Sequence, residues 1–282
     1  MSDTYYVNGQ FIASDQAVLP VTDLGLLRGY GVFDYFRTYH REPFRLMDNL
    51  ARLRRSADII GLTLPWSDAE LAQIVRDALD RNAHHEESAV RIVVTGGSSP
   101  DNINPASAPS LMVLVSAVKP NPDWWYSDGV KVITIQIGRL FPDAKSTNYI
   151  PAILALREAR AAGAIEALYL SPNDEVLEAT TSNLFIMRDG TLITPPADGI
   201  LSGLTRRTVL EITAAHYPRS EQPISRDELI SADEVFMTSA NKRVVPVTQV
   251  DDVRIGSGRP GPVTQQVMTL FDEVTWGVRE AR

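Results

Sequence analysis

The sequence predicts an α+β protein that consists of two domains. Strand-like and helix-like segments follow one another along the 282 residues, and no repeat or charge block interrupts them. Pro120 and Pro122 lie within a short stretch that neither a strand nor a helix accepts readily, because proline lacks a backbone donor and restricts the preceding residue. We therefore predict a small α/β domain over residues 1–118, a linker over 119–125 and a larger domain over 126–282.

The first domain is expected to combine strands with two helices. The turn pair Asn8-Gly9 predicts a hairpin over residues 5–13. Asp48 is a suitable N-cap for the first helix, and Ser67 with Glu70 forms the capping box of the second. The remaining elements are strands over 32–39, 89–95 and 111–118 and helices over 49–61 and 67–82.

The second domain shows the same mixture of periodicities. Asp189-Gly190 predicts the turn of a second hairpin. The predicted elements, in order, are a strand over 130–137, a helix over 149–162, a strand over 167–170, a hairpin of 177–187 with 191–194, helices over 203–216 and 225–231, strands near 234–238 and 244–254, and a helix over 263–278.

Composition excludes several classes of function. The 35 acidic residues outnumber the 27 basic ones and give a net charge of -8, so no global positive field favours nucleic acid or an anionic membrane. Cysteine is absent, which excludes disulfides, thiolate metal ligands and thiol nucleophiles. The chain has no secretory leader pattern and no run of about 18 apolar residues. We expect a cytoplasmic protein.

Two local patterns are interpreted as structural. His84 and His85 are neighbours, which are expected to point in different directions, so a solvated pair is favoured and no metal site is predicted. Gly96 and Gly97 follow a strand but lack the spacing of a dinucleotide loop and the lysine of a phosphate loop. A tight turn is therefore expected there.

Lysine is rare enough for each one to be considered separately: the four are Lys119, Lys131, Lys145 and Lys242. Lys145 follows an apolar strand and precedes a helix, within the polar segment 143–149. An exposed loop lysine is one interpretation. The other is a Schiff-base lysine, whose amine bonds to an aldehyde cofactor and later moves protons. Lys131 and Lys242 are expected to be solvated.

Blocks elsewhere in the chain favour the second interpretation. They are Leu27–Asp34, Lys145–Tyr149, Glu178–Phe185 and Asp233–Ser239, with Gly203–Arg206 between the last two. In this order they resemble the class IV, fold type IV, pyridoxal-phosphate transaminases, which include branched-chain and D-amino-acid aminotransferases and aminodeoxychorismate lyase. The resemblance implies a small N-terminal α/β domain, a larger barrel-like C-terminal domain, bound pyridoxal 5′-phosphate in a cleft between them, and a homodimer with the active site near the subunit interface.

The resemblance also implies residue roles at the cofactor ring. Lys145 matches the lysine that forms the Schiff base and moves the substrate proton. Glu178 matches the carboxylate that faces the pyridine nitrogen and keeps it protonated, so that the ring can accept electrons. Tyr149 matches the tyrosine whose hydroxyl contacts the ring oxygen.

The cofactor phosphate is expected at a helix start. Free N–H groups of Leu204 and Thr205 suit a dianion there, and Thr205 adds a hydroxyl. Arg52 matches the family arginine that contacts the same phosphate. Ser239 and Ala240 match a second phosphate-binding turn, although many relatives carry threonine in place of Ala240. Likewise, Asn49 replaces a histidine that several relatives carry.

Arginines are the candidates for the substrate carboxylate, and the resemblance favours Arg28 and Arg91, with Arg37 as a third. The familiar D-amino-acid enzymes carry an arginine where this chain has Gly96, and branched-chain enzymes usually carry Glu-Gly-Ile-Arg where this chain has residues 34–37. The blocks look more like a less common group of D-amino-acid transaminases. We expect transfer from D-alanine or D-glutamate to 2-oxoglutarate or pyruvate. The alternatives are an L-branched-chain transaminase, an aminodeoxychorismate lyase and a non-catalytic binding protein of this fold.

Overall fold

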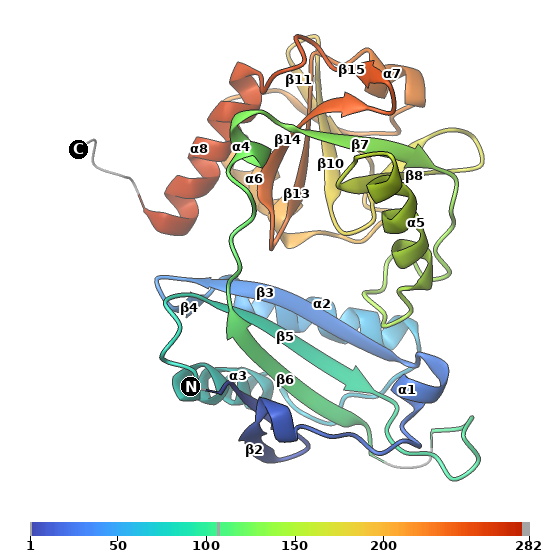
Figure 1. Ribbon diagram of the computed structural model, residues 1–282, viewed down its shortest axis with the longest axis vertical. Coiled ribbons are helices and arrows are strands. Elements are labelled where there is room, and N and C mark those ends of the chain that lie inside the picture. The colour runs from blue at the N-terminus through green and yellow to red at the C-terminus, as the bar shows by residue number, and fades with distance from the viewer. Residues whose placement is uncertain (1, 106–107, 278–282) are drawn as a thin grey trace. The chain divides into compact units, whose positions relative to one another are not determined.

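The computed structural model describes residues 2–105 and 108–277, and its chain divides into two compact units (Figure 1). Unit 1 contains the described residues up to Lys119 together with Asp143–Asn148. Unit 2 contains Pro120–Pro142 and the described residues from Tyr149 onward. The sequence interpretation placed segment 143–148 in the second domain, whereas its contacts group it with unit 1. The end of the last predicted helix, at residue 278, lies outside the described residues.

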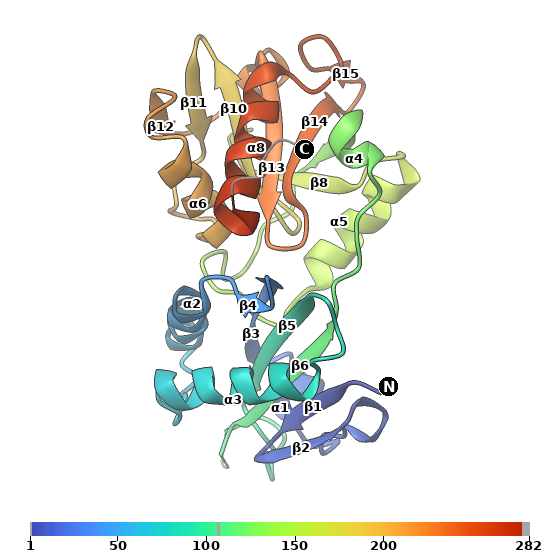
Figure 2. The same cartoon turned by 90° about the vertical axis from the view of Figure 1, so that its left-hand side faces the viewer.

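Unit 1 is a six-stranded antiparallel sheet with two long helices on one face (Figures 1 and 2). The strand order is β2-β1-β6-β5-β3-β4. The strands are β1 (Thr4–Val7), β2 (Gln10–Ala13), β3 (Gly31–Tyr39), β4 (Glu42–Pro43), β5 (Ser88–Thr95) and β6 (Ser110–Ala117), and the helices are α1 (Leu24–Arg28), α2 (Leu46–Ile59) and α3 (Asp68–Arg81). A 3-10 turn covers Ser14–Gln16.

The apolar faces of α2 and α3 form the core of unit 1. Leu50, Leu53 and Val75 are fully buried against the side chains that β3, β5 and β6 direct to the same face of the sheet. Burial of such side chains is the main favourable contribution to folding. The other face of the sheet is therefore available for polar and charged groups.

The two long helices begin in different ways. The capping box of Ser67 and Glu70 is confirmed, because each side chain accepts a hydrogen bond from the backbone of the other residue. The prediction that Asp48 caps α2 is wrong. The helix begins earlier, after Arg45 in a left-handed conformation, and Asp48 lies in its first turn, where a negative charge suits the helix dipole.

Unit 2 contains a nine-stranded mixed sheet that is visibly curled (Figures 1 and 2). The order is β12-β11-β10-β13-β14-β7-β8-β9, and β15 pairs with β14. The strands are β7 (Val130–Ile135), β8 (Glu166–Leu170), β9 (Val176–Ala179), β10 (Asn183–Arg188), β11 (Thr191–Thr194), β12 (Arg219–Glu221), β13 (Glu234–Ser239), β14 (Arg243–Val250) and β15 (Val253–Arg254). The helices are α4 (Trp124–Ser127), α5 (Ile150–Ala161), α6 (Leu204–Ile212), α7 (Arg226–Ile230) and α8 (Pro262–Trp276).

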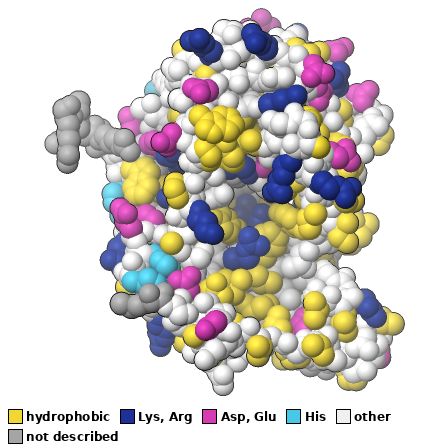
Figure 3. All heavy atoms as spheres, in the orientation of Figure 1, with side chains coloured by type: hydrophobic (Ala, Val, Ile, Leu, Met, Phe, Trp, Pro, Cys, Tyr) yellow, Lys and Arg dark blue, Asp and Glu magenta, His cyan; other side chains and the backbone are white. Residues whose placement is uncertain are grey.

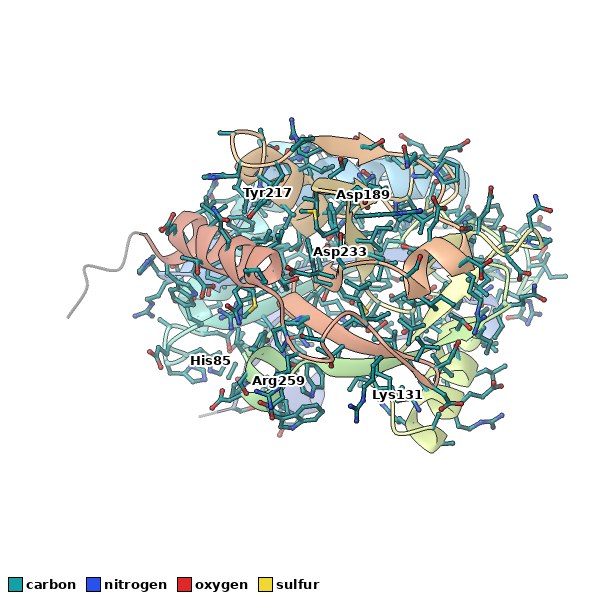
Figure 4. All side chains as sticks on the ribbon, turned by 90° about the horizontal axis from the view of Figure 1, so that it is seen from above. His85, Lys131, Asp189, Tyr217, Asp233 and Arg259 are labelled. Carbon is teal, nitrogen blue, oxygen red and sulfur yellow. The ribbon has the colours of Figure 1, made fainter. Side chains whose placement is uncertain are left out.

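Helices connect or cover these strands. Strands β7 and β8 are parallel and are joined by α5, as a crossover connection requires. The hairpin of β10 and β11 turns at Asp189, whose N–H donates to the Asp233 carboxylate at 3.2 Å. Both residues are labelled in Figure 4. Among the residues that the structure describes, no helix is long and apolar enough to cross a membrane.

Some elements of unit 2 differ from the sequence prediction. The predicted strand over 177–187 is divided into β9 and β10, because the chain bends at 180–182. Helix α6 ends at Ile212, before the predicted residue 216, and α4 begins inside the predicted linker. The bend matters for the site, because Glu178 precedes it and Asn183 follows it.

Candidate active site

The backbone around Lys145 is fixed by both a strand and a helix of unit 1. Phe33 N–H donates to the Lys145 carbonyl oxygen at 2.9 Å, and Lys145 N–H donates to Ser56 Oγ at 3.1 Å. Two residues further, Thr147 N–H donates to the Gly31 carbonyl at 2.9 Å. The half-buried Lys145 side chain places Nζ 4.7 Å from the centroid of the Phe33 ring. This is a constrained lysine rather than a fully exposed one in a loop.

Arg91 contacts the same aromatic ring as Lys145. Phe33 and Tyr35 alternate along β3 with the core residue Val32, so they project from the face of the sheet that α2 and α3 do not cover. The Arg91 guanidinium lies 5.1 Å from the Phe33 centroid and 5.7 Å from the Tyr35 centroid. Two cationic groups therefore share one aromatic neighbour on this face.

The Tyr35 hydroxyl belongs to the same face. Burial raises its pKa, while the nearby Arg37 and Arg91 guanidinium groups act in the opposite direction. Arg37 itself lies over the Tyr39 ring, at 4.7 Å from its centroid. Arg28 is exposed at the end of α1 and donates to the Leu27 carbonyl at 2.8 Å. Of the three predicted substrate arginines, Arg91 lies over the Phe33 ring, and Lys145 Nζ lies over the same ring.

Arg52 is held by a buried carboxylate. Its Nε donates to Asp34 Oδ2 at 2.9 Å and its Nη2 donates to Asp34 Oδ1 at 2.7 Å, while Asp34 is fully buried. Ser56 links this pair to Lys145, because its hydroxyl donates to the Arg52 carbonyl and accepts from the Lys145 N–H. The bidentate contact fixes the plane of the guanidinium. Sequence reasoning gave Asp34 no role.

Glu178 is a buried carboxylate of unit 2. Its carboxylate is held by the Arg139 guanidinium, by Leu201 N–H at 3.2 Å and by Asn183 Nδ2 at 3.4 Å, and the residue is 5% exposed. Hydrogen bonds of this kind favour the charged form of a carboxyl. Sequence reasoning missed Arg139, because nothing in the chain distinguished it from the other arginines.

A buried phenol lies close to Glu178. Burial raises the pKa of Tyr169 to about 12, against the opposing effect of Arg139, and Glu178 and Tyr149 add to the rise. Its hydroxyl has no hydrogen-bond partner within the described part of the chain. Tyr149 is the N-cap residue of α5. Tyr149 and Glu178 therefore both act on the buried Tyr169 hydroxyl.

The start of α6 offers backbone donors. Gly203 is the N-cap and supplies no side-chain acceptor, so the N–H groups of the first turn, including those of Leu204 and Thr205, are not capped from there. A Cβ at position 203 would lie 1.8 Å from Asn183 Oδ1, which explains why glycine stands here. A helix start of this kind suits a phosphate.

The predicted second phosphate turn follows β13. Ser239 Oγ accepts a hydrogen bond from Lys242 N–H at 3.2 Å, and Ala240 lies between them in the turn. The buried Thr238 hydroxyl, one residue earlier, has no partner among the described residues. Buried polar atoms without partners often indicate a ligand or water that would satisfy them.

Lys242 is not the solvated lysine that the sequence suggested. It is 9% exposed, and its ammonium pairs with Glu166 and donates to Thr181 Oγ1 at 2.6 Å. Burial works against ionisation of Glu166, but the Lys242 ammonium and the Thr180 and Thr181 hydrogen bonds outweigh it and hold the pKa of that carboxyl below its ordinary value. By contrast Lys131, labelled in Figure 4, faces the exposed Asp252 at 3.7 Å.

His84 and His85 also differ from expectation. The sequence predicted that the two rings point in different directions, but their centroids are 4.1 Å apart and both Nε2 atoms lie near one carboxylate oxygen of Asp3. The expected divergence is therefore wrong.

Comparison with known proteins identifies similar chains. Residues 31–250 match the family described as amino-transferase class IV. The chain is 32% identical to the D-alanine aminotransferase of Bacillus licheniformis, over 94% of each chain. It is also 32% identical to the branched-chain-amino-acid aminotransferase of Pseudomonas aeruginosa, over 98% of this chain and 94% of that one. Among solved structures, the branched-chain amino acid aminotransferase of Escherichia coli has a TM-score of 0.92 and 28% identity, and the match covers 100% of this chain and 97% of that one.

Proposed function

The chain belongs to the class IV aminotransferases, and from that premise we propose that it moves an amino group from a D-amino acid to a 2-oxo acid. The fold is that of fold type IV, with a mixed α+β chain and a curled sheet in unit 2, in keeping with the match to the Escherichia coli structure. Class IV aminotransferases use pyridoxal 5′-phosphate. The class of substrates, amino acids and 2-oxo acids, follows from the family.

The residues present fit this cofactor. A phosphate needs donors, and the uncapped first turn of α6 with the buried Thr205 provides them. A pyridine nitrogen that must stay protonated needs an anion, and Glu178 is a buried, oriented carboxylate. The hydroxyls of Tyr169 and Thr238, which have no partner among the residues that the structure describes, leave polar capacity for a bound group.

The proposed mechanism assigns a separate task to each residue. When bound, the cofactor supplies an aldehyde for the substrate amine and a ring that withdraws electrons from the substrate Cα. Lys145 Nζ would move a proton from the substrate Cα to the carbon that carried the aldehyde in the first half of the transfer, and in the opposite direction in the second half. Glu178 holds a proton at the ring nitrogen. Tyr149 orients the ring through its hydroxyl, and Arg52, Leu204, Thr205, Ser239 and Ala240 hold the phosphate.

Arg91 carries the proposal about the substrate, because it contacts the ring over which Lys145 Nζ lies. An arginine there can bind the substrate carboxylate near the lysine that moves the proton. Position 96, where the familiar D-amino-acid enzymes carry an arginine, cannot bind the carboxylate in this chain. It is a glycine, and a Cβ added there would lie 2.5 Å from the Tyr30 ring. We assign Arg28 and Arg37 supporting contacts with the carboxylate or with an acidic side chain.

The polar character of this face supports small or acidic substrates. Tyr35, Arg37 and Arg91 project from it, so D-alanine or D-glutamate fits it better than a branched apolar side chain. The branched-chain alternative rests on the Escherichia coli structure and the Pseudomonas relative. Because the two named groups of relatives are equally similar in sequence, we separate them by experiment.

The test is a half-reaction titration of the cofactor-loaded enzyme with paired D- and L-amino acids, followed by visible absorbance. We expect D-alanine and D-glutamate to convert the cofactor at least tenfold faster than L-leucine. Arg91→Gln should weaken apparent substrate affinity at least tenfold, while Arg76→Gln, an exposed change on α3, should leave it unaltered. Conversion by L-leucine without conversion by D-alanine would reject D-specificity.

We also propose a homodimer, in keeping with the resemblance to fold type IV transaminases. Val18, Val21 and Leu26 lie close in sequence in unit 1 and are 76%, 75% and 67% exposed. Exposed apolar groups of this kind are common at interfaces. Light scattering coupled to size exclusion should give twice the chain mass, and a single-chain mass at micromolar concentration would oppose the proposal.

A further inference from the structure

Three side chains of unit 1, those of Asp3, His84 and His85, converge on one point. His85 Nε2 lies 2.8 Å from Asp3 Oδ1, and His84 Nε2 lies 3.5 Å from the same oxygen. One donor atom from each of the three residues lies within 4.8 Å of the others. Figure 3 shows histidine side chains on the face that it draws, and Figure 4 labels His85.

The backbone holds these residues in place before any ligand binds. Asn82 connects the end of α3 to β1, because its side chain accepts from Thr4 N–H at 2.9 Å and donates to the Thr4 carbonyl at 2.8 Å. The Asn82 carbonyl accepts from His85 N–H at 3.0 Å, and the Asp3 carbonyl accepts from Ser14 N–H at 2.8 Å. The segments that carry the carboxylate and the two rings are thus joined through the same asparagine.

The spacing of the donor atoms suits a borderline divalent ion. Ligands at about 2.0–2.2 Å from a tetrahedral zinc ion lie roughly 3.3–3.6 Å from one another. The oxygen-to-nitrogen distance of 3.5 Å falls within that range, and the distance of 2.8 Å is shorter than it. Two imidazoles and one carboxylate favour Zn²⁺, Ni²⁺ or Cu²⁺ over Mg²⁺ and Ca²⁺, which prefer oxygen ligands.

We propose that Asp3, His84 and His85 form a surface site for a divalent transition-metal ion, with Zn²⁺ as the representative ligand. The side chains of Asp3 and His84 are each 24% exposed, so an ion can enter from solvent and keep water in its open position. Metal binding would join the N-terminal strand to the turn after α3. This site is independent of the proposed transaminase activity.

Calorimetric titration with zinc chloride tests the proposal, using the cofactor-loaded chain without a histidine tag. We expect one equivalent to bind, and Asp3→Asn, His84→Gln and His85→Gln each to raise the dissociation constant at least tenfold. His216→Gln is the matched control, because this histidine lies outside the cluster, and it should bind as the unaltered chain does. Magnesium should give no saturable binding.

Cobalt absorbance gives a second readout that does not depend on activity. Co²⁺ should develop ligand-field bands in the unaltered chain and in His216→Gln, and these bands should disappear in the triple variant of Asp3, His84 and His85. Thermal unfolding without metal will show that the variants fold. Equal zinc affinity in the triple variant, or no zinc binding by the unaltered chain below millimolar concentration, would overturn the proposal.

Discussion

Charged side chains in both units are positioned by ion-pair partners. Asp34 holds Arg52, Arg139 holds Glu178, and Glu166 holds Lys242. A buried ion pair adds little net stability, but removal of one partner leaves an uncompensated charge. Each pair can therefore be tested by a single substitution.

Lys242→Met should lower the free energy of unfolding at pH 7 by about 3–5 kcal/mol, because Glu166 would be left buried without its cation. Urea denaturation measures the change. Lys131→Met, at an exposed pair, should change stability by less than about 1 kcal/mol. The double variant Lys242→Met, Glu166→Met should recover part of the loss, and a loss as large as that of the single variant would contradict this explanation.

The same pair predicts a dependence on pH. The pKa of Glu166 is lower in the folded chain than its ordinary value, so its contribution to stability is present above about pH 4.3 and is lost as pH falls through the folded value. Without Lys242, burial raises the pKa instead. The stability difference between the unaltered chain and Lys242→Met should therefore shrink between pH 7 and pH 4. A stability difference that stays constant between pH 7 and pH 4 would contradict this role of the Glu166 pKa.

Glu178→Gln should reduce turnover about 100-fold or more while the cofactor stays bound, because a neutral amide no longer favours a protonated ring nitrogen. Stopped-flow absorbance of the half-reaction measures this. Glu158→Gln, on the exposed face of α5, is the matched control and should retain full activity. Unchanged turnover in Glu178→Gln would reject the assigned role.

For single residues, the sequence predicts chemical roles more readily than it predicts ion-pair partners. The blocks around Lys145 and Glu178 predicted their roles, which borohydride reduction and the kinetics of Glu178→Gln test. Their neighbours were not predicted, because Asp34, Arg139 and Glu166 lie 18, 39 and 76 positions from their ion-pair partners. Only the fold brings such residues together, so Lys242 was wrongly expected to be solvated.

The elements of the chain matter to function mainly through their ends. Helix α6 begins after a glycine without a side-chain cap, and β9 ends directly after Glu178, at the bend whose Thr180 and Thr181 side chains bind Glu166. These ends position the donors and the carboxylate that we assign to the cofactor. A substitution at such an end should therefore change the affinity for the cofactor more than it changes the packing of the core.

Gly203→Ala should weaken pyridoxal 5′-phosphate binding at least tenfold, because the new Cβ would clash with Asn183 and force the N-cap of α6 to shift. Fluorescence titration of the cofactor-free chain gives the dissociation constant. Gly138→Ala is the matched control, since a Cβ there meets no atom of the described residues within 4 Å. An unchanged constant for Gly203→Ala would show that the helix start does not hold the phosphate.

Local signals predicted some element boundaries and not others. The capping box at Ser67 is contained within four residues, and the structure confirms it. The start of α2 depends on Arg45 in a left-handed conformation, which residue type does not indicate. The single strand predicted over 177–187 is divided because the side chain of Glu166, from β8, binds the bend, and a local pattern holds no information about that contact.

At the scale of the whole molecule, linear order and spatial grouping differ. Lys145 follows the linker in sequence, yet segment 143–148 belongs to unit 1, together with Arg52 and Arg91. Glu178, Tyr149 and Thr205 belong to unit 2. The mixed α+β class could be predicted from periodicity, whereas this return of the chain to unit 1 depends on hydrogen bonds to Gly31, Phe33 and Ser56.

Cofactor binding should stabilise the folded chain by mass action. A ligand at 100 times its dissociation constant adds about 2.7 kcal/mol when it binds the native state alone. Calorimetric unfolding should therefore show a higher midpoint for the loaded chain than for the cofactor-free chain. Pyridoxal, which lacks the phosphate, should raise the midpoint much less. Equal midpoints for all three samples would argue against a phosphate site.

The most direct test of the account is to identify the lysine that bonds to the cofactor. The loaded enzyme is reduced with borohydride, digested and analysed by mass spectrometry, which locates the cofactor mass on a peptide. We predict that the mass is on Lys145 and that Lys145→Ala carries none and shows no measurable turnover. Attachment of the cofactor mass to Lys119, Lys131 or Lys242 would contradict the assignment of Lys145. A fully active enzyme in which reduction attaches no cofactor to any lysine would contradict it as well.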